Sequence, residues 1–151
     1  FTAEEIWSYL PHSDSDNSES IFLNQMPEKS GITFRDEFVK KWELIYSTRE
    51  TVNKALEEKR NEKVIGKSLE ANIIIHSGGE MFEKYSQLSD QLAEILIVSG
   101  VSVINDKDGE TEFEVVRATG EKCERCWVYS ETVGKDSEHP TLCSRCASVV
   151  K

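Results

Sequence analysis

Apolar residues recur every three or four positions along residues 2–10, 34–64 and 80–99, which predicts three amphipathic helices. The longest of these would extend about 45 Å at ~1.5 Å per residue. This helix has one face that a core could cover, while charged residues occupy its other faces. Its apolar positions follow steps of three, four or seven residues: Phe34, Phe38, Trp42, Ile45, Val52 and Leu56.

Local signals predict how the shorter helices begin and end. Thr2 and Glu5 are three residues apart, which is the spacing of a capping box, and Pro11 ends that helix. Ser77 and Glu80 have the same spacing before the third helix. Both pairs are therefore expected to satisfy free backbone N–H groups at a helix start.

Stretches rich in β-branched residues predict strands within residues 68–77, 100–106 and 110–119. The last two are joined by the sequence Asp-Lys-Asp-Gly, an Asp-Gly turn of the kind found in β-hairpins. A shorter apolar stretch, residues 21–28, contains Pro27 and is expected to be extended. Strand, helix, strand and strand would then form a small α/β unit.

The four cysteines form two C-x-x-C pairs, Cys123 with Cys126 and Cys143 with Cys146, separated by sixteen residues. This spacing falls in the range of zinc ribbons, and it uses every cysteine of the chain. Two such pairs can complete a tetrahedron around one ion, with Zn–S bonds of about 2.3 Å. Residues 119–151 have too little apolar surface to fold alone, so metal binding would supply their folding free energy. We therefore predict one structural zinc ion.

Other uses of these cysteines fit the sequence less well. Disulfides are disfavoured in a reducing compartment, and a thioredoxin-like redox pair would not need two C-x-x-C copies. His139 could replace one cysteine, but four thiolates already fill the shell and leave no open position for catalysis. Four thiolates around Zn²⁺ carry a formal charge of −2, which Lys122, Arg125 and Arg145 are placed to offset.

Trp127 follows the second cysteine directly, and two interpretations of it remain open. The ring could fill the small core of the ribbon. Alternatively, Trp127 and the neighbouring Arg125 could form an aromatic platform beside a cation, which suits an unpaired RNA base. Stacking of this kind contributes about 1–3 kcal/mol per base, and Arg binds a phosphate or a base edge. Composition alone does not choose between them.

The formal net charge of −10 at pH 7 is distributed unevenly. Residues 32–67 carry nine basic and seven acidic groups, a local charge of +2. These cations could form a solvated helix face paired with nearby glutamates. They could also meet RNA phosphates, and the candidates for this are Arg49, Arg60 and Lys63. The acidic average does not forbid such a local contact.

The chain shows no apolar run near the ~20 residues of a membrane helix. It begins at Phe1 without an initiator methionine or a leader, so we expect it to be a piece of a longer polypeptide. With cysteines only in C-x-x-C pairs, these features predict a cytoplasmic, reducing location. His76, at the end of a predicted strand, is expected to have a structural or solvent role.

Three stretches resemble bacterial isoleucyl-tRNA synthetases, in the order in which that family has them. FTAEEIWSYLP is similar to a late helix of the anticodon-binding bundle of class I synthetases for branched aliphatic amino acids. VNKALEEKRNEKVIGKSLEANI has the family's Ile-Gly-x-Ser-Leu-Glu-Ala core at residues 65–71. GEKCERCWVYSETVGKDSEHPTLCSRC resembles the C-terminal zinc finger, including the Trp after the second cysteine. The resemblance covers nearly the whole chain.

The resemblance implies an enzyme that activates isoleucine with ATP and transfers it to its tRNA. The family's His-Ile-Gly-His and Lys-Met-Ser-Lys-Ser signatures are absent from these 151 residues, so no catalytic residue is expected here and ATP would bind elsewhere. A binding role is implied instead, in which this region holds the anticodon arm of the isoleucine tRNA. The four cysteines match the finger's zinc ligands. Arg125 and Trp127 match its basic and aromatic positions, and Lys122 and Arg145 join them as RNA-contact candidates.

The resemblance also implies an organisation and a set of partners. An α+β chain in three parts is expected: the end of a helical anticodon-binding domain at 1–66, a small α/β junction domain at 67–118, and a four-cysteine zinc ribbon at 119–151. The expected partners are the isoleucine tRNA and the rest of the synthetase, with neither membrane nor DNA. Two departures from the family are Val128, where many relatives have His, and Met26, where relatives often have Trp.

Two alternatives to the synthetase hypothesis remain. A DNA glycosylase of the formamidopyrimidine type has a similar zinc finger, but it needs an N-terminal Pro nucleophile and a Gly-Arg pair before the finger. Here the chain starts with Phe1 and approaches the finger as VVRATGEKC. A stand-alone zinc ribbon that binds proteins would leave the long basic-edged helix unexplained.

Overall fold

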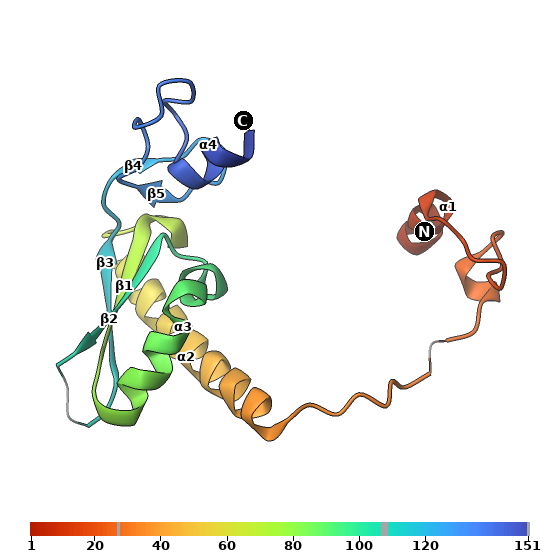
Figure 1. Cartoon of the computed structure of the whole chain (residues 1–151), viewed down its shortest axis with the longest axis horizontal. Coiled ribbons are helices and arrows are strands. Elements are labelled where there is room, and N and C mark those ends of the chain that lie inside the picture. The colour runs from red at the N-terminus through yellow and green to blue at the C-terminus, as the bar shows by residue number, and fades with distance from the viewer. Residues whose placement is uncertain (27, 107–108, 151) are drawn as a thin grey trace. The chain divides into compact units, whose positions relative to one another are not determined.

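The computed structural model describes residues 1–26, 28–106 and 109–150 (Figure 1). The chain separates into two compact units, Phe1–Arg35 and Asp36–Lys151. The helices and small sheets of the described residues confirm the predicted α+β fold. Within these ranges, no helix is long and apolar enough to cross a membrane.

The first unit contains one short α-helix, α1 (Thr2–Tyr9). Its N-cap is Phe1, and no side chain caps it. The predicted capping box of Thr2 and Glu5 is therefore wrong, because Thr2 is already the first helical residue and stands one position too late to cap. No residue of α1 is buried.

The stretch after the acidic loop forms a 3₁₀ turn, η1 (Ile21–Leu23), rather than the extended segment predicted. Ser20 explains the difference, because its Oγ accepts a hydrogen bond from the backbone N–H of Phe22 at 3.2 Å and so starts the turn. The same hydroxyl donates to Oε1 of Glu4 at 2.6 Å, which ties η1 to α1. Pro27, which was expected to close this stretch, lies outside the described residues.

The second unit begins with α2 (Asp36–Asn61), a helix of 26 residues. At 1.5 Å per residue it is about 39 Å long, shorter at both ends than predicted. Phe34 and Phe38, which were expected on the core face, are 65% and 45% exposed. Lys63, beyond the last turn, has a left-handed backbone with φ of 60°. The buried face of the helix consists of Ile45, Thr48, Val52 and Leu56.

A mixed three-stranded sheet contains β1 (Ala71–Ser77), β2 (Gly100–Asn105) and β3 (Glu112–Arg117) in the order β2-β1-β3. β1 pairs with β2 in parallel and with β3 in antiparallel. The predicted hairpin between β2 and β3 is therefore wrong, because the more buried β1 lies between them. Residues 107–108 of the expected turn lie outside the described residues.

The crossover from β1 to β2 is α3 (Gly79–Leu96). Its N-cap is Gly78, without a side-chain hydrogen bond, so the predicted cap by Ser77 and Glu80 is wrong. Ser77 is the last residue of β1, and its side chain is fully buried. The helix ends at Ile97, which adopts a left-handed conformation with φ of 58°.

One hydrophobic core unites α2, α3 and the sheet. Ile73 and Ile75 of β1 are fully buried in the same cluster as Val52 of α2 and Leu92 of α3. α2 thus shares its core with the α/β unit. The domain boundaries at residues 66 and 118 remain predictions.

The C-terminal segment is a small finger that follows β3 in the same unit (Figure 1). It consists of a two-stranded ribbon, β4 (Glu121–Lys122) with β5 (Tyr129–Ser130), and a closing helix, α4 (Ser144–Val150). Its core contains the cysteines packed with Val133 and Leu142. So few apolar side chains leave the finger dependent on another source of stability.

Candidate metal centre and its aromatic turn

The four cysteines converge on one point of the finger. Cys123 and Cys126 lie in the turn between β4 and β5, while Cys143 and Cys146 lie at the start of α4. Their sulfur atoms all lie within 4.8 Å of one another, and all four thiols are free. Burial of three of these cysteines shields the cluster from water.

The geometry of this cluster fits a tetrahedral zinc ion. Four sulfurs at about 2.3 Å from a central Zn²⁺ would be about 3.8 Å apart along each edge of the tetrahedron. Sγ of Cys126 and Sγ of Cys143 are 3.8 Å apart. A disulfide would require about 2 Å. The donor set and its spacing therefore suit a closed, structural zinc site.

Backbone N–H groups and Arg125 prepare the sulfurs for a cation. Burial raises the pKa of Cys123, but backbone N–H groups of Cys126, Cys143 and Arg125 outweigh it and lower this pKa to about 6. One of these bonds runs from the Cys143 N–H to Sγ of Cys123 at 3.3 Å. Nη1 of Arg125 donates to Sγ of Cys146 at 3.7 Å and so lowers the pKa of that thiol. Burial raises the pKa of Cys143 to about 11, so binding a metal there would release a proton.

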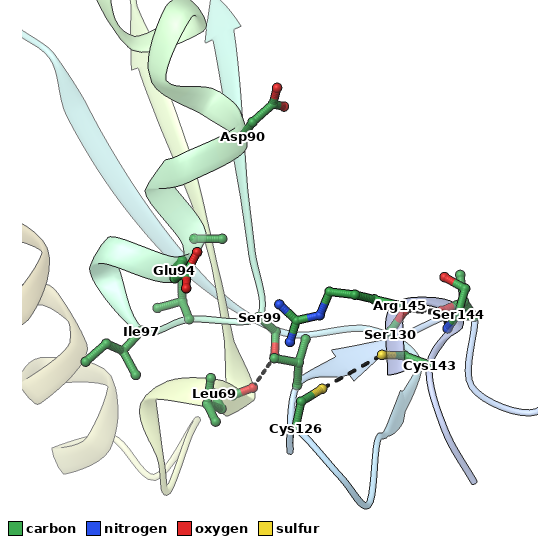
Figure 2. A pocket seen from close by; sticks show the side chains of 14 residues that line it. Leu69, Asp90, Glu94, Ile97, Ser99, Cys126, Ser130, Cys143, Ser144 and Arg145 are labelled. Atoms are coloured by element: carbon green, nitrogen blue, oxygen red, sulfur yellow. Dashed lines mark hydrogen bonds between the residues drawn. The ribbon is translucent and has the colours of Figure 1, made fainter. Parts of the chain in front are cut away.

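Arg145 also contacts the cysteine cluster. It interacts with Cys126, and this contact raises the pKa of the guanidinium further. Figure 2 shows its side chain reaching from α4 toward Ser99, across a groove of about 510 Å³ between the finger and the end of α3. Asp90 and Glu94 line the α3 side of this groove. Arg125 and Arg145 thus both contact the cysteine sulfurs, as the sequence predicted, whereas Lys122 lies over the Trp127 ring.

Ser99 holds the finger against the α/β body. Its hydroxyl accepts the backbone N–H of Tyr129 at 2.8 Å and donates to the carbonyl of Leu69 (Figure 2). Immediately before the finger, the backbone N–H of Ala118 donates to the carbonyl of Glu70 at 2.7 Å. The body therefore positions the ribbon strand next to the first cysteine turn.

Trp127 does not fill the core of the finger. Its side chain is 57% exposed, and the core contains Val133 and Leu142 instead. Nζ of Lys122 lies 5.2 Å from the centre of the Trp127 ring, a cation–π contact. Of the two interpretations left open by the sequence, the core filler is therefore wrong.

The backbone of Trp127 is unusual as well. It has φ of 66°, in the left-handed region that glycine adopts freely and other residues adopt at a cost of about 1–2 kcal/mol. Two backbone bonds hold this turn: Trp127 N–H to the Cys123 carbonyl, and Cys123 N–H to the Val128 carbonyl, both at 2.9 Å. The turn therefore directs a large ring outward at a position where glycine would be easier to accommodate.

The ring also borders a small cleft that sequence reasoning missed. Lys67 and Glu70 of the body line this cleft together with Lys122, Trp127 and Tyr129. Lys67 precedes Trp127 by sixty residues, so no local pattern could have placed them together. Two lysines thus border one aromatic surface.

Arg49, Arg60 and Lys63, the cations predicted on the long helix, line neither the groove beside the cysteines nor the cleft beside Trp127. Arg60 is engaged in an ion pair with Glu57 and a 2.7 Å hydrogen bond to the hydroxyl of Ser68. Arg49 and Lys63 are exposed. The structure therefore groups Lys122, Arg125, Trp127 and Arg145 around the metal centre, while contact of Arg49, Arg60 and Lys63 with RNA remains a prediction.

Comparisons with known proteins agree with this geometry. The family described as "Zinc finger found in FPG and IleRS" matches residues 120–149, and the "Anticodon-binding domain of tRNA ligase" matches residues 1–75. The finger family alone does not separate ligases from glycosylases, whereas the second match does. It extends past the predicted boundary at residue 66, into β1.

Curated relatives cover the whole chain. An isoleucine–tRNA ligase of Bacillus mycoides is 44% identical over 159 aligned residues, which is 99% of this chain. One from Bacillus cereus strain B4264 is 43% identical over the same length. The chain spans 17% of the length of each of these relatives. It belongs to the isoleucine–tRNA ligase family, and it corresponds to the C-terminal part of such a ligase.

Proposed function

We propose that this chain is the tRNA-binding C-terminal region of an isoleucine–tRNA ligase. In this proposal it holds the anticodon arm of the isoleucine tRNA, while a catalytic domain elsewhere in a longer, cytoplasmic protein uses ATP to attach isoleucine. Its partners are that tRNA and the rest of the ligase, and neither DNA nor a membrane is expected. The family match and the relatives that cover the chain support this role.

The metal would serve this function structurally. Cys123, Cys126, Cys143 and Cys146 would hold one Zn²⁺. Four thiolates leave no open position for a substrate or a water molecule, so the ion would supply rigidity and no reaction chemistry. Because the finger buries few apolar side chains, the metal would fix the turn between Cys123 and Cys126.

The observation that carries the proposal is the outward placement of Trp127. An exposed ring on a rigid turn loses little conformational entropy when it stacks on an unpaired base. Such stacking contributes about 1–3 kcal/mol per base. Lys122 and Lys67 beside the ring would meet the negatively charged backbone of the same nucleotide. Arg125 is turned toward Cys146, so its role in this proposal is mainly to support the sulfur.

Replacement of Trp127 tests the proposal. Trp127→Ala in the zinc-loaded protein should weaken binding of the isoleucine tRNA by roughly 5- to 150-fold, the range that corresponds to one lost stacking contact. Trp127→Tyr is the matched control, since it keeps a flat ring and should lose much less affinity. Zinc content and the folding transition should stay unchanged in both variants. Unchanged affinity in Trp127→Ala would contradict the proposed contact.

A further inference from the structure

A second positively charged concavity lies on the body, between the first halves of α2 and α3. Lys40 and Lys41 of α2 and Lys84 of α3 line a groove of about 580 Å³, over the apolar side chains of Leu44 and Leu88. In a protein of formal charge −10, three lysines directed to one groove form a local exception. Sequence reasoning missed the group because Lys84 lies 43 residues after Lys41.

The charges of this groove are poorly compensated. Glu37 lines it and stands three and four residues before Lys40 and Lys41, a spacing at which helical residues often pair. Yet within the residues described, neither lysine forms an ion pair. Lys84 pairs with Glu80 at 2.8 Å, but both side chains are largely exposed, so this pair is weak and can open.

The three lysines stand at similar positions on their helices. All three stand in the second turn of a helix, since α2 begins at Asp36 and α3 at Gly79. The dipole effect of a helix falls off within its first turn, where Asp36, Glu37 and Glu80 stand, so the positive charge of the groove comes from the lysine side chains themselves. By contrast, Arg60 at the other end of α2 is already engaged by Glu57 and Ser68. Unlike Arg60, neither Lys40 nor Lys41 has an ion-pair partner among the described residues.

We propose that this groove, which we call the lysine groove (Lys40, Lys41 and Lys84), binds phosphate groups of the RNA backbone. The inference rests on the proposed function, which supplies a polyanion as partner. Lysines suit this role because a flexible ammonium binds phosphate as a point charge without reading a base. The lysine groove would hold the RNA body in place, while Trp127 engages a single unpaired base on the finger.

Salt dependence of tRNA binding tests the lysine groove. In the zinc-loaded chain, the triple variant Lys40→Gln, Lys41→Gln, Lys84→Gln should reduce the slope of log K against log salt by about 2, which corresponds to three lost phosphate contacts at ~0.7 each. The same reduction is expected with an unrelated tRNA, because phosphate contacts are independent of sequence. Circular dichroism should show an unchanged fold. If it does not, the single variant Lys40→Gln, at an exposed position, should reduce the slope by about 0.7.

A matched control distinguishes the effect of charge in the lysine groove from the effect of the total charge of the chain. Lys54→Gln, Lys59→Gln, Lys135→Gln removes the same charge outside the lysine groove and should leave the slope unchanged. An equal fall in this control, or an unchanged slope in the groove variant, would overturn the inference while wild-type binding still supports the proposed function. If the wild-type chain binds neither tRNA, the proposed function itself fails.

Discussion

Nζ of Lys122 lies 5.2 Å from the centre of the Trp127 indole, on a turn whose backbone is left-handed at the tryptophan. An exposed cation–π contact of this kind contributes about 0.5–1 kcal/mol, enough to orient the ring but too little to hold the turn. The turn is held by backbone hydrogen bonds and by Cys123 and Cys126. The Trp127 ring and the Lys122 ammonium therefore lie together on a turn whose conformation does not depend on the contact between them.

Alanine usually gives a more stable variant than glycine, but the left-handed backbone at Trp127 predicts the reverse at this position. Trp127→Gly should be more stable than Trp127→Ala by about 1 kcal/mol, because only glycine adopts a φ of 66° without strain. Unfolding of the two zinc-loaded variants in denaturant measures the difference. Greater stability of the alanine variant would show that the turn is not left-handed in solution.

Loss of one metal ligand should unfold the finger and spare the body. In Cys143→Ser, bound zinc should fall far below one ion per chain, because three thiolates no longer close the shell. Amide hydrogen exchange should become fast in the finger and stay slow in β1 and α3, whose core includes Ile73 and Leu92. Zinc retained at one ion per chain in this variant would argue against the four-cysteine site.

Gly120 is where the chain enters the finger, and it should tolerate no side chain. Its φ is +84°, and an added Cβ would lie 2.4 Å from the backbone carbon of Ser130. Gly120→Ala should therefore destabilise the finger by about 2 kcal/mol or more. Gly134→Ala is the control, since Gly134 has the same φ but its nearest neighbour, the Pro140 carbonyl, would be 3.8 Å away. Similar losses in both variants would mean that the close approach to Ser130 is not decisive.

The contacts of the His76 ring predict that the stability of the fold depends on pH. Hydrogen bonds from its ring to Asp106 at 2.8 Å and to Glu114 at 3.3 Å raise its pKa above the ordinary value. A raised folded pKa means that protonation stabilises the fold. This contribution is fully present below about pH 6.5, the pKa of an unperturbed histidine, and is lost as pH rises through the folded pKa.

Thermal unfolding between pH 5 and 8 checks this linkage. The wild-type protein should lose stability across that range relative to His76→Asn, which cannot titrate. Parallel pH profiles for the two proteins would show that the ring's charge makes no contribution. Asp106→Asn, which removes the closer carboxylate, should flatten the wild-type profile in part.

Several features could be predicted from the sequence because they depend on local spacing. The C-x-x-C pairs identify the metal ligands, and the apolar period of α2 and α3 gives the helices that cover the sheet. Strand order was not predictable in this way: an Asp-Gly turn favours a hairpin locally, but the more buried β1 takes the central position. Ser77 likewise has the spacing of a cap, yet the pleat of β1 directs its hydroxyl into the core.

Parts of the candidate site also could not be predicted from local sequence patterns. Trp127 is apolar and lies in a segment with a very small core, so burial was a reasonable expectation, and only the left-handed turn directs it outward. Lys67 joins its cleft, and Lys84 joins Lys40 and Lys41, through tertiary packing between segments far apart in the sequence. No local pattern carries that information.

We propose that this region holds tRNA and takes no part in the chemistry of amino-acid activation. The most direct measurement compares a complete ligase with one that lacks these 151 residues, in isoleucine-dependent ATP–pyrophosphate exchange and in tRNA charging. We expect truncation to leave exchange nearly unchanged and to reduce charging strongly. Unchanged charging in the truncated enzyme, or an equal loss of exchange and charging, would contradict the account.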